Sequence, residues 1–211
     1  MANSFENQVV LISGGSSGIG YSTAEQLLSE GWCVIINGRN EHRGQEAVLR
    51  LRRVSAKVRF VKGDVSKVNE CRHIVEEAIR WYGPLDALVT AAGYYEEQLI
   101  DDVTEASFDE MMGTNLKGTV FLCKEAAPYL RQTGGSIVTV SSDAGLQGNV
   151  ACSVYGATKG AIVSFTKSLA LEMAPHNVRV NCVCPGDVDT PLVAKQLEDN
   201  ILDDEAARRE M

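Results

Sequence analysis

Short apolar runs alternate along most of the chain with longer segments in which apolar residues recur every three or four positions. The short runs are typical of strands and lie at residues 9–13, 33–37, 57–62, 87–91, 136–141 and 178–183. The longer segments are typical of helices and lie at residues 18–30, 41–54, 67–82, 104–131 and 155–174. Parallel neighbouring strands require crossover connections, and helices then cover both faces of the sheet. The pattern predicts an α/β fold with one doubly wound parallel sheet of about six strands.

The chain has 211 residues, and we interpret residues 1–211 as a single domain. Its hydrophobic content of 45% is typical of a globular protein, and no apolar run approaches the roughly 18 residues of a membrane-spanning helix. The net charge of -8 argues against nucleic acid as the main partner. Residues 1–8 contain no apolar leader, so we expect a cytoplasmic location.

Six cysteines are scattered along the chain without a C-x-x-C pair. Cys182 and Cys184 lie two residues apart at the end of a predicted strand and would share one of its faces if the strand continued through Cys184. Thiolates are good zinc ligands, but the nearby His176 is not at zinc-finger spacing from them. We therefore interpret the cysteines as buried free thiols and expect no metal site.

A glycine-rich turn, Gly14 to Gly20, follows the first predicted strand and has the pattern G-x-x-x-G-x-G. Glycines permit a tight turn there and let a pyrophosphate approach the N-terminus of the next helix, so the turn indicates a dinucleotide site. The same residues also spell G-x-S-x-G around Ser16, the nucleophile pattern of α/β-hydrolases. That rival needs an acid and then a histidine at later strand ends, and no histidine has an obvious place there.

The end of the second predicted strand bears on the choice of cofactor. An NAD site would have Asp or Glu at this position to bind the ribose hydroxyl, whereas this chain has Asn37, Gly38, Arg39 and Asn40. The guanidinium of Arg39 is suited to a phosphate. We therefore favour NADP(H), with NAD(H) possible; the alternative is that Arg39 is a solvated loop charge.

Tyr155 and Lys159 form a Tyr-x-x-x-Lys run at the start of a predicted helix. Residues four apart lie on the same face of a helix, so the phenol and the ammonium can be neighbours. Lowering the pKa of a tyrosine from about 10 to about 7 requires roughly 4 kcal/mol. The Lys159 charge and a cationic cofactor ring are suited to supply it. Alone, the pair is a spacing that chance also produces.

Taken together, the motifs resemble the short-chain dehydrogenase/reductase family from about residue 8 to residue 192. The motifs that carry the resemblance are Gly14, Gly18 and Gly20; Asp64 and Val65; Asn115; Ser142; Tyr155 and Lys159; and Pro185, Gly186, Val188 and Thr190. The resemblance implies a Rossmann-type sheet with strand order 3-2-1-4-5-6. It also implies an oxidoreductase that interconverts a secondary alcohol and a ketone, either 3-oxoacyl carrier-protein reductase-like or hydroxysteroid dehydrogenase-like.

Four residues have catalytic roles by this resemblance. Tyr155 is expected to be the general acid in carbonyl reduction and the base in alcohol oxidation, and Lys159 to bind the nicotinamide ribose and lower the pKa of Tyr155. Ser142 is expected to orient the substrate oxygen, and Asn115 to hold a water molecule that relays protons from Lys159. The alternative for Ser142 is that it only caps a loop, with the neighbouring Ser141 orienting the substrate oxygen in its place. The alternative for Asn115 is that it is an ordinary helix-kink or capping residue.

The expected cofactor contacts lie at the carboxyl ends of the strands. They are Gly14, Ser16, Ser17, Gly18, Ile19, Gly20, Arg39, Asn40, Asp64, Val65, Ala92, Gly93, Tyr155, Lys159, Pro185, Gly186, Val188 and Thr190. Asp64 is expected to accept a hydrogen bond from the adenine or to close a turn, and Thr190 to bind the carboxamide or to start a final helix. The expected substrate contacts are Ser142, Tyr155, Tyr94, Tyr95, Gln147, Cys152 and Asp187.

Two departures from the family pattern stand out. The usual Asn-Asn-Ala-Gly is replaced by Thr90, Ala91, Ala92 and Gly93, so the chain lacks the amide side chains that hydrogen-bond between the central strands. The sequence ends at Met211, before the usual C-terminal helix and seventh strand; we expect it to be part of a longer chain, with a natural short form as the alternative and residues 193–211 as a mobile lid or tail. We expect a homodimer or homotetramer with a small-molecule substrate. A non-catalytic NAD(P)-binding regulator with the same fold is the alternative function.

Overall fold

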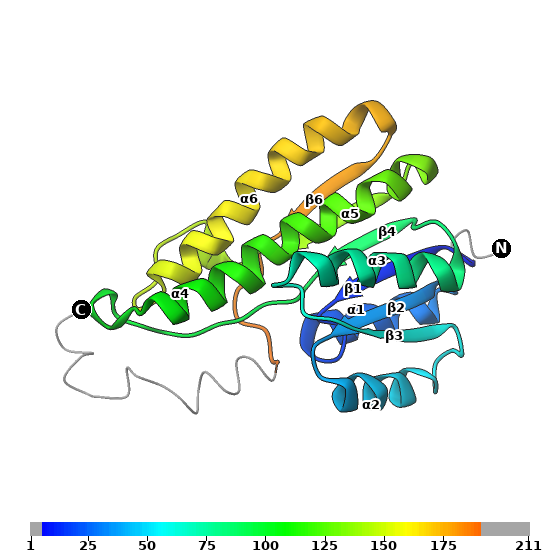
Figure 1. Ribbon diagram of the computed structural model, residues 1–211, viewed down its shortest axis with the longest axis horizontal. Coiled ribbons are helices and arrows are strands. Elements are labelled where there is room, and N and C mark those ends of the chain that lie inside the picture. The colour runs from blue at the N-terminus through cyan, green and yellow to red at the C-terminus, as the bar shows by residue number, and fades with distance from the viewer. Residues whose placement is uncertain (1–5, 191–211) are drawn as a thin grey trace.

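Six parallel strands form one sheet in the order β3-β2-β1-β4-β5-β6, in a computed structural model that describes residues 6–190 (Figure 1). The strands are β1 Val9–Ser13, β2 Cys33–Gly38, β3 Val58–Lys62, β4 Ala87–Thr90, β5 Ser136–Val140 and β6 Arg179–Val183. Each pair is in parallel register, for example Leu11 opposite Ile35 and Leu88. The predicted sheet and its strand order are confirmed, with strand ends that differ by at most one residue.

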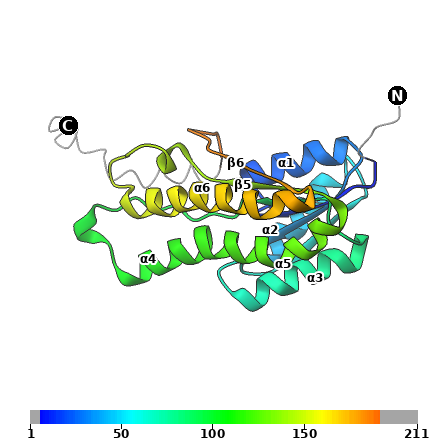
Figure 2. The same cartoon turned by 90° about the horizontal axis from the view of Figure 1, so that it is seen from above.

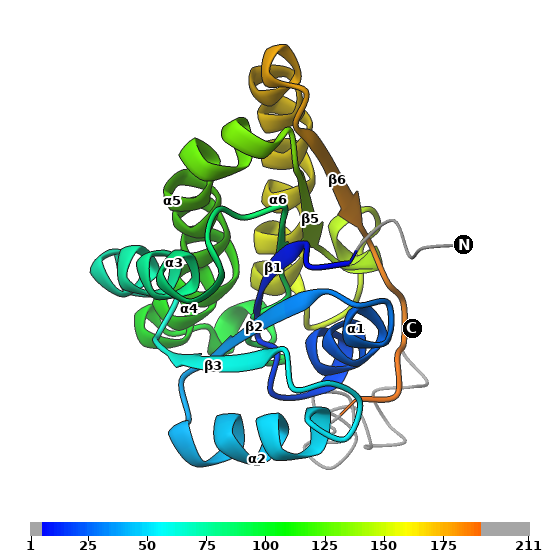
Figure 3. The ribbon, with the colours of Figure 1, turned by 90° about the vertical axis from the view of Figure 1, so that its right-hand side faces the viewer.

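Helices cover both faces of the sheet, as the continuous burial of its central strands requires. Val10 and Ile12 point into a core cluster with α1 (Gly18–Ser29) and α2 (Glu41–Leu51). Val9 and Leu11 point into a second cluster with α3 (Val68–Tyr82), α5 (Gly118–Thr133) and α6 (Ser153–Met173). Figure 3 shows these two helical layers on opposite sides of the strands, and Figure 2 shows α5 and α6 side by side.

The helical region predicted at residues 104–131 is divided into three parts. Helix α4 (Glu105–Met111) is followed by a π-helical segment, Met112–Lys117, and then by α5. A π-helical turn adds a residue to the repeat, and such turns are frequent at functional sites. Here the π-helical segment contains Asn115, whose buried side chain faces the loop after β4.

The strand order reverses between β1 and β4, which lie side by side at the centre of the sheet. Ligands of doubly wound sheets bind at the carboxyl ends of the strands near this reversal. The turns after β1, β4 and β5 therefore meet at one edge. Two short helical turns, η1 (Ile100–Asp102) and η3 (Asp143–Gly145), follow β4 and β5, and η4 (Ala174–His176) precedes β6.

All six cysteines are free thiols, as expected. Four of them are buried, but the prediction of burial is wrong for Cys182 and Cys184, which are partly exposed because β6 has a neighbour on one side only among the described strands. Their sulfur atoms lie 4.0 Å apart, and residues 6–190 contain no group of three or more possible metal ligands. No helix in the same range is long and apolar enough to cross a membrane. The predicted lid at residues 193–211 lies outside the described residues.

Candidate active site

Tyr155 and Lys159 lie on adjacent turns of α6, as their spacing predicted. The Lys159 side chain is buried, and its Nζ donates a hydrogen bond to the carbonyl of Val140 at 3.1 Å. The same nitrogen lies 5.5 Å from the centroid of the Tyr155 ring. Burial lowers the pKa of Lys159 to about 8, because the charged ammonium loses its hydration. The pair therefore places the buried Lys159 ammonium next to the Tyr155 phenol ring.

Ser142 follows β5 and contacts Tyr155 through a side-chain hydrogen bond. Burial raises the pKa of Tyr155, and the hydrogen bond with Ser142 opposes that shift. Ser142 Oγ also donates to Asp143 Oδ1 at 2.8 Å and accepts from the backbone N–H of Ala144 at 3.2 Å. Ser142 thus both caps η3 and touches Tyr155, and Asp143, which directly follows it, is a site residue that sequence reasoning missed.

Asn115 connects three elements of the site with a fully buried side chain. Its Oδ1 accepts from Tyr94 N at 2.7 Å, and its Nδ2 donates to Tyr94 O at 2.9 Å and to Thr158 Oγ1 at 3.1 Å. Thr158 in turn donates to the carbonyl of Tyr155 at 2.8 Å. Asn115 therefore ties the loop after β4 to the first turn of α6. Thr158, inside the Tyr-x-x-x-Lys run, is the second residue that sequence reasoning missed.

The two tyrosines after β4 point to different parts of the site. The Tyr95 ring meets the Tyr155 ring edge to face, with centroids 4.6 Å apart. The Tyr94 hydroxyl donates to Glu96 at 2.8 Å. Burial raises the pKa of Tyr94 to about 12, helped by Glu96 and opposed by the charge of Arg39. Tyr95 thus lies against the Tyr155 ring, whereas the Tyr94 hydroxyl lies near Arg39, which follows β2.

The turn after β1 is shaped so that only glycine fits at critical positions. Gly14 has φ +68°, and a Cβ there would lie 2.7 Å from Ala92 N. A Cβ at Gly20 would lie 2.6 Å from Gly14 O. Ser17 is the N-cap of α1 without a side-chain cap, which leaves N–H groups of the first turn directed outward. Close backbone approach at a helix N-terminus is the arrangement that binds a pyrophosphate.

Arg39 and Asn40 follow β2 at the same edge. Arg39 Nη1 lies 3.6 Å from Glu110 Oε1, with about half of each side chain exposed, while Asn40 Oδ1 accepts from Arg43 N and caps α2. Asp64 Oδ1 accepts from Ser66 N at 3.0 Å, so Asp64 closes the turn after β3. Burial opposes ionisation of Asp64, but the Ser66 hydrogen bonds and the charges of Arg39 and Lys67 lower its pKa.

The remaining predicted cofactor residues line the same edge or support it. Ser16 lies beside Gly38, Ile19 packs on the core, and Val65 packs against the start of α5. Ala92 N donates to Ser13 Oγ at 3.2 Å, Gly93 lies beside Lys159 Nζ, and Thr190 lies beside Gly18. Pro185 O accepts from Asp143 N at 2.9 Å, and Gly186 lies near the Asp143 carboxylate. Val188 is 38% exposed.

Two predicted substrate residues, Gln147 and Asp187, lie farther out than the third, Cys152. Gln147 is exposed and its Nε2 lies 3.4 Å from Asp143 Oδ2. Cys152 is buried, with its sulfur 3.4 Å from the Tyr95 hydroxyl, so it joins the group around Tyr155. Asp187 is exposed. The structure therefore brings Ser142, Tyr155, Tyr95 and Cys152 together.

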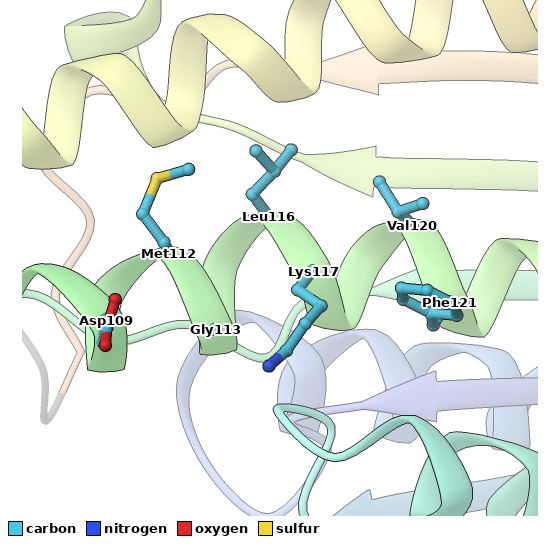
Figure 4. A pocket seen from close by; sticks show the side chains of 7 residues that line it. All are labelled: Asp109, Met112, Gly113, Leu116, Lys117, Val120 and Phe121. Carbon is cyan, nitrogen blue, oxygen red and sulfur yellow. The ribbon is translucent and has the colours of Figure 1, made fainter.

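A separate groove of about 470 Å³ lies along α4, the π-helical segment and α5, away from these residues. It is lined by Asp109, Met112, Gly113, Leu116, Lys117, Val120 and Phe121. Figure 4 shows Met112, Leu116 and Val120 projecting from the same side of the helix. The groove shares no lining residue with the group around Tyr155.

Comparison with known proteins agrees with this geometry. A family model described as short chain dehydrogenase matches residues 8–201. An oxidoreductase of Thermotoga maritima is 39% identical over 183 residues, which are 86% of this chain and 72% of that protein. L-fucose dehydrogenase of Mus musculus is 36% identical over 189 residues, 89% of this chain and 68% of that protein. A crystal structure of an actinorhodin polyketide ketoreductase with NADPH superposes with a TM-score of 0.90 at 33% identity, covering 94% of this chain and 77% of the other.

Proposed function

The chain belongs to the short-chain dehydrogenase/reductase family of oxidoreductases, and on that premise we propose that it interconverts a secondary alcohol and a ketone by hydride transfer with NADP(H). The observation that carries the proposal is the convergence of Tyr155, Lys159 and Ser142 at the carboxyl edge of the sheet, next to a turn shaped for a dinucleotide. No single motif in the sequence has that specificity.

The cofactor fits the residues that would hold it. The Gly14 to Gly20 turn leaves no room for a Cβ at Gly14 or Gly20, as close approach of a pyrophosphate to the backbone requires. Lys159 would hold the ribose, and Arg39 would face a 2′-phosphate in place of the carboxylate that selects NAD. When bound, the nicotinamide supplies or accepts the hydride. NAD(H) is the alternative, and Arg39 is the residue that separates the two.

In the proposed mechanism, Tyr155 donates its hydroxyl proton to the carbonyl oxygen during reduction and takes it back during oxidation. Ser142 would turn its hydroxyl proton from Asp143 Oδ1 to the reacting oxygen and so hold that oxygen beside the phenol. The Lys159 ammonium, fixed by the Val140 carbonyl, stabilises the phenolate that remains after proton transfer. Asn115 keeps the Tyr94 loop and α6 in register. Its expected role in holding a relay water remains part of the proposal.

The test is a cofactor-coupled screen that follows NADPH and NADH consumption by absorbance. The ketone panel includes a sugar-derived ketone, a 3-ketosteroid and a β-ketoacyl thioester, because relatives named L-fucose dehydrogenase and 3β-hydroxysteroid dehydrogenase share about a third of the sequence. Turnover of at least one class supports the proposal and narrows the substrate. Tight NADPH binding without any turnover would instead support a nucleotide-binding regulator.

The hydrolase alternative is weaker in the structure. Ser16 lies in the turn after β1, and within residues 6–190 it has no hydrogen-bonded histidine; His42 is exposed on α2 and faces Glu46. A hydrolase would cleave esters without cofactor, and Ser16→Ala would abolish that cleavage. We expect no such activity.

We further propose that a second copy of the chain covers the face of α4 and α5, giving a homodimer or homotetramer. Phe108, Met112, Leu116 and Val120 recur every fourth residue along this face, and Phe108 is 42% exposed. The groove described above lies along the same stripe. Light scattering on the wild type and on Leu116→Glu tests this: we expect an oligomer that the charge disrupts, and a monomeric wild type would contradict it.

Six free thiols also favour the reducing cytoplasm as the location of the protein.

A further inference from the structure

Tyr95 contacts the proposed proton donor directly. Its ring and that of Tyr155 make an edge-to-face pair with centroids 4.6 Å apart and an interplanar angle of 88°. The two rings come from different elements, since Tyr95 lies in the loop after β4 and Tyr155 in the first turn of α6. Edge-to-face geometry is the favoured arrangement for aromatic pairs, because the positive edge of one ring meets the negative face of the other.

The Tyr95 hydroxyl is held from two sides. It donates to Glu97 Oε1 at 2.5 Å and lies 3.4 Å from Cys152 Sγ. A phenol has one proton, so the proton that Tyr95 gives to Glu97 is not available to a substrate. In the contact with Cys152, the thiol is therefore the donor and the Tyr95 oxygen the acceptor. Burial raises the pKa of Tyr95, with Cys152 and Glu97 adding to the shift, so this phenol stays protonated. Tyr95 is therefore fixed and is not itself a proton source.

The backbone below Tyr95 is held as firmly as its hydroxyl. The neighbouring Tyr94 has both its N–H and its carbonyl bonded to the buried amide of Asn115. Asn115 continues to Thr158 and so to α6, the helix that bears Tyr155. The Tyr95 ring is thus held through the neighbouring backbone and through its own hydroxyl, and it packs edge to face with the Tyr155 ring.

We propose that Tyr95 is a positioning residue, whose ring holds the Tyr155 phenol in the orientation for proton transfer and shields one side of it from water. The inference rests on the proposed function, because it assigns Tyr95 a role in the reaction attributed to Tyr155. Displacement of a reacting group by about 1 Å can cost about a hundredfold in rate. A ring that fixes the phenol therefore acts on kcat more than on cofactor binding.

Shielding also gives a pH signature. Burial is the largest influence on the pKa of Tyr155 and raises it; the other groups near this phenol are Ser142, Asp143, Cys152, Lys159 and the Tyr95–Glu97 pair. Removing the Tyr95 ring admits water and lowers the pKa of Tyr155. The reduction rate needs the protonated phenol, so its alkaline limb moves to lower pH. Loss of packing alone would not move that limb.

The experiment compares Tyr95→Phe, Tyr95→Leu and Tyr95→Ala on the best substrate from the screen. We expect Tyr95→Phe, which keeps the ring, to stay within about threefold of wild-type kcat. Tyr95→Ala is expected to lower kcat by about 10- to 100-fold and to shift the alkaline limb downward, with the NADPH dissociation constant within about twofold. Tyr95→Leu keeps much of the apolar volume and provides a folded variant if Tyr95→Ala unfolds; its kcat is expected to fall in the same direction.

Tyr129→Ala is the matched control, because Tyr129 is a partly buried ring on α5 that packs on the core away from Tyr155. We expect it to lower thermal stability without changing kcat or the pH profile of the folded protein. Wild-type kcat and an unshifted profile in folded Tyr95→Leu or Tyr95→Ala would overturn the inference, as would an equal loss in Tyr95→Phe. Full activity in Tyr155→Phe would overturn the proposed function instead, so the two failures are distinguishable.

Discussion

Replacing Lys159 with methionine should stabilise the protein while removing its activity. The Lys159 side chain is 5% exposed, and burial lowers its pKa from 10.5 to about 8. A shift of this size corresponds to a free-energy cost of about 3 kcal/mol for holding the charged ammonium in the folded state. Methionine keeps the aliphatic stem but leaves the Val140 carbonyl without its donor, which costs about 1 kcal/mol. The net gain at neutral pH is about 2 kcal/mol.

The pH dependence of this gain follows from the sign of the shift. The folded pKa lies below the unfolded one, so between about 8 and 10.5 the unfolded state binds more protons and the wild type gains stability as pH rises. The advantage of Lys159→Met is therefore complete below about pH 8 and disappears by about pH 10.5.

Thermal or denaturant unfolding of the cofactor-free protein measures this directly. For a chain of this length the gain corresponds to a rise in Tm of about 4 to 8 °C at neutral pH. Lys167→Met, an exposed lysine on the same helix, is the control and should change Tm little. A Lys159→Met protein that is less stable than wild type at neutral pH would refute the argument from burial. A stability advantage of the same size at every pH would refute it as well.

Two further predictions concern cofactor choice and strand packing. Arg39→Ala should weaken NADPH binding about tenfold and NADH binding by less than about twofold, measured by fluorescence titration; equal effects on both cofactors would remove the case for NADP(H). Thr90→Val should raise the free energy of unfolding by about 1 kcal/mol, because the Thr90 hydroxyl is buried and has no hydrogen-bond partner among the described residues. Thr139→Val, which loses a 2.7 Å bond to Thr166, should lower it instead, and matching signs would contradict the explanation.

The central strands could be predicted because they are buried on both faces and are nearly uniformly apolar, whereas the strand order was implied by the resemblance to the family. β1 and β2 are buried at almost every position, as their sequences indicate. The turn after β1 was predictable for a similar reason, since the backbone geometry at Gly14 excludes other residues. The central strands and this turn depend on local sequence alone.

The interruption between α4 and α5 could not be predicted in the same way. The apolar stripe of Phe108, Met112, Leu116 and Val120 continues through the π-helical segment with helical spacing. What distinguishes the segment is the amide of Asn115, which bonds Tyr94 and Thr158 from elements 21 and 43 residues away. Long-range hydrogen bonds of this kind are not visible in a local pattern.

The candidate site shows the same division. Tyr155, Lys159 and Ser142 were expected from motifs, and the structure brings them together. Asp143 was missed because its carboxylate reaches Ser142 only through the tight η3 turn. Both Tyr94 and Tyr95 were expected to contact the substrate. In an irregular loop, unlike in a strand, the sequence does not indicate which way each side chain points. Only the structure shows that Tyr95 is the one beside Tyr155.

The account rests most directly on Tyr155 as the group that transfers the proton. On the best substrate from the screen, Tyr155→Phe keeps the ring and its contact with Tyr95 but removes the hydroxyl. We predict that kcat falls by about 10²- to 10⁴-fold while NADPH binds within about twofold of wild type. A Tyr155→Phe protein that turns over at the wild-type rate would contradict the central claim.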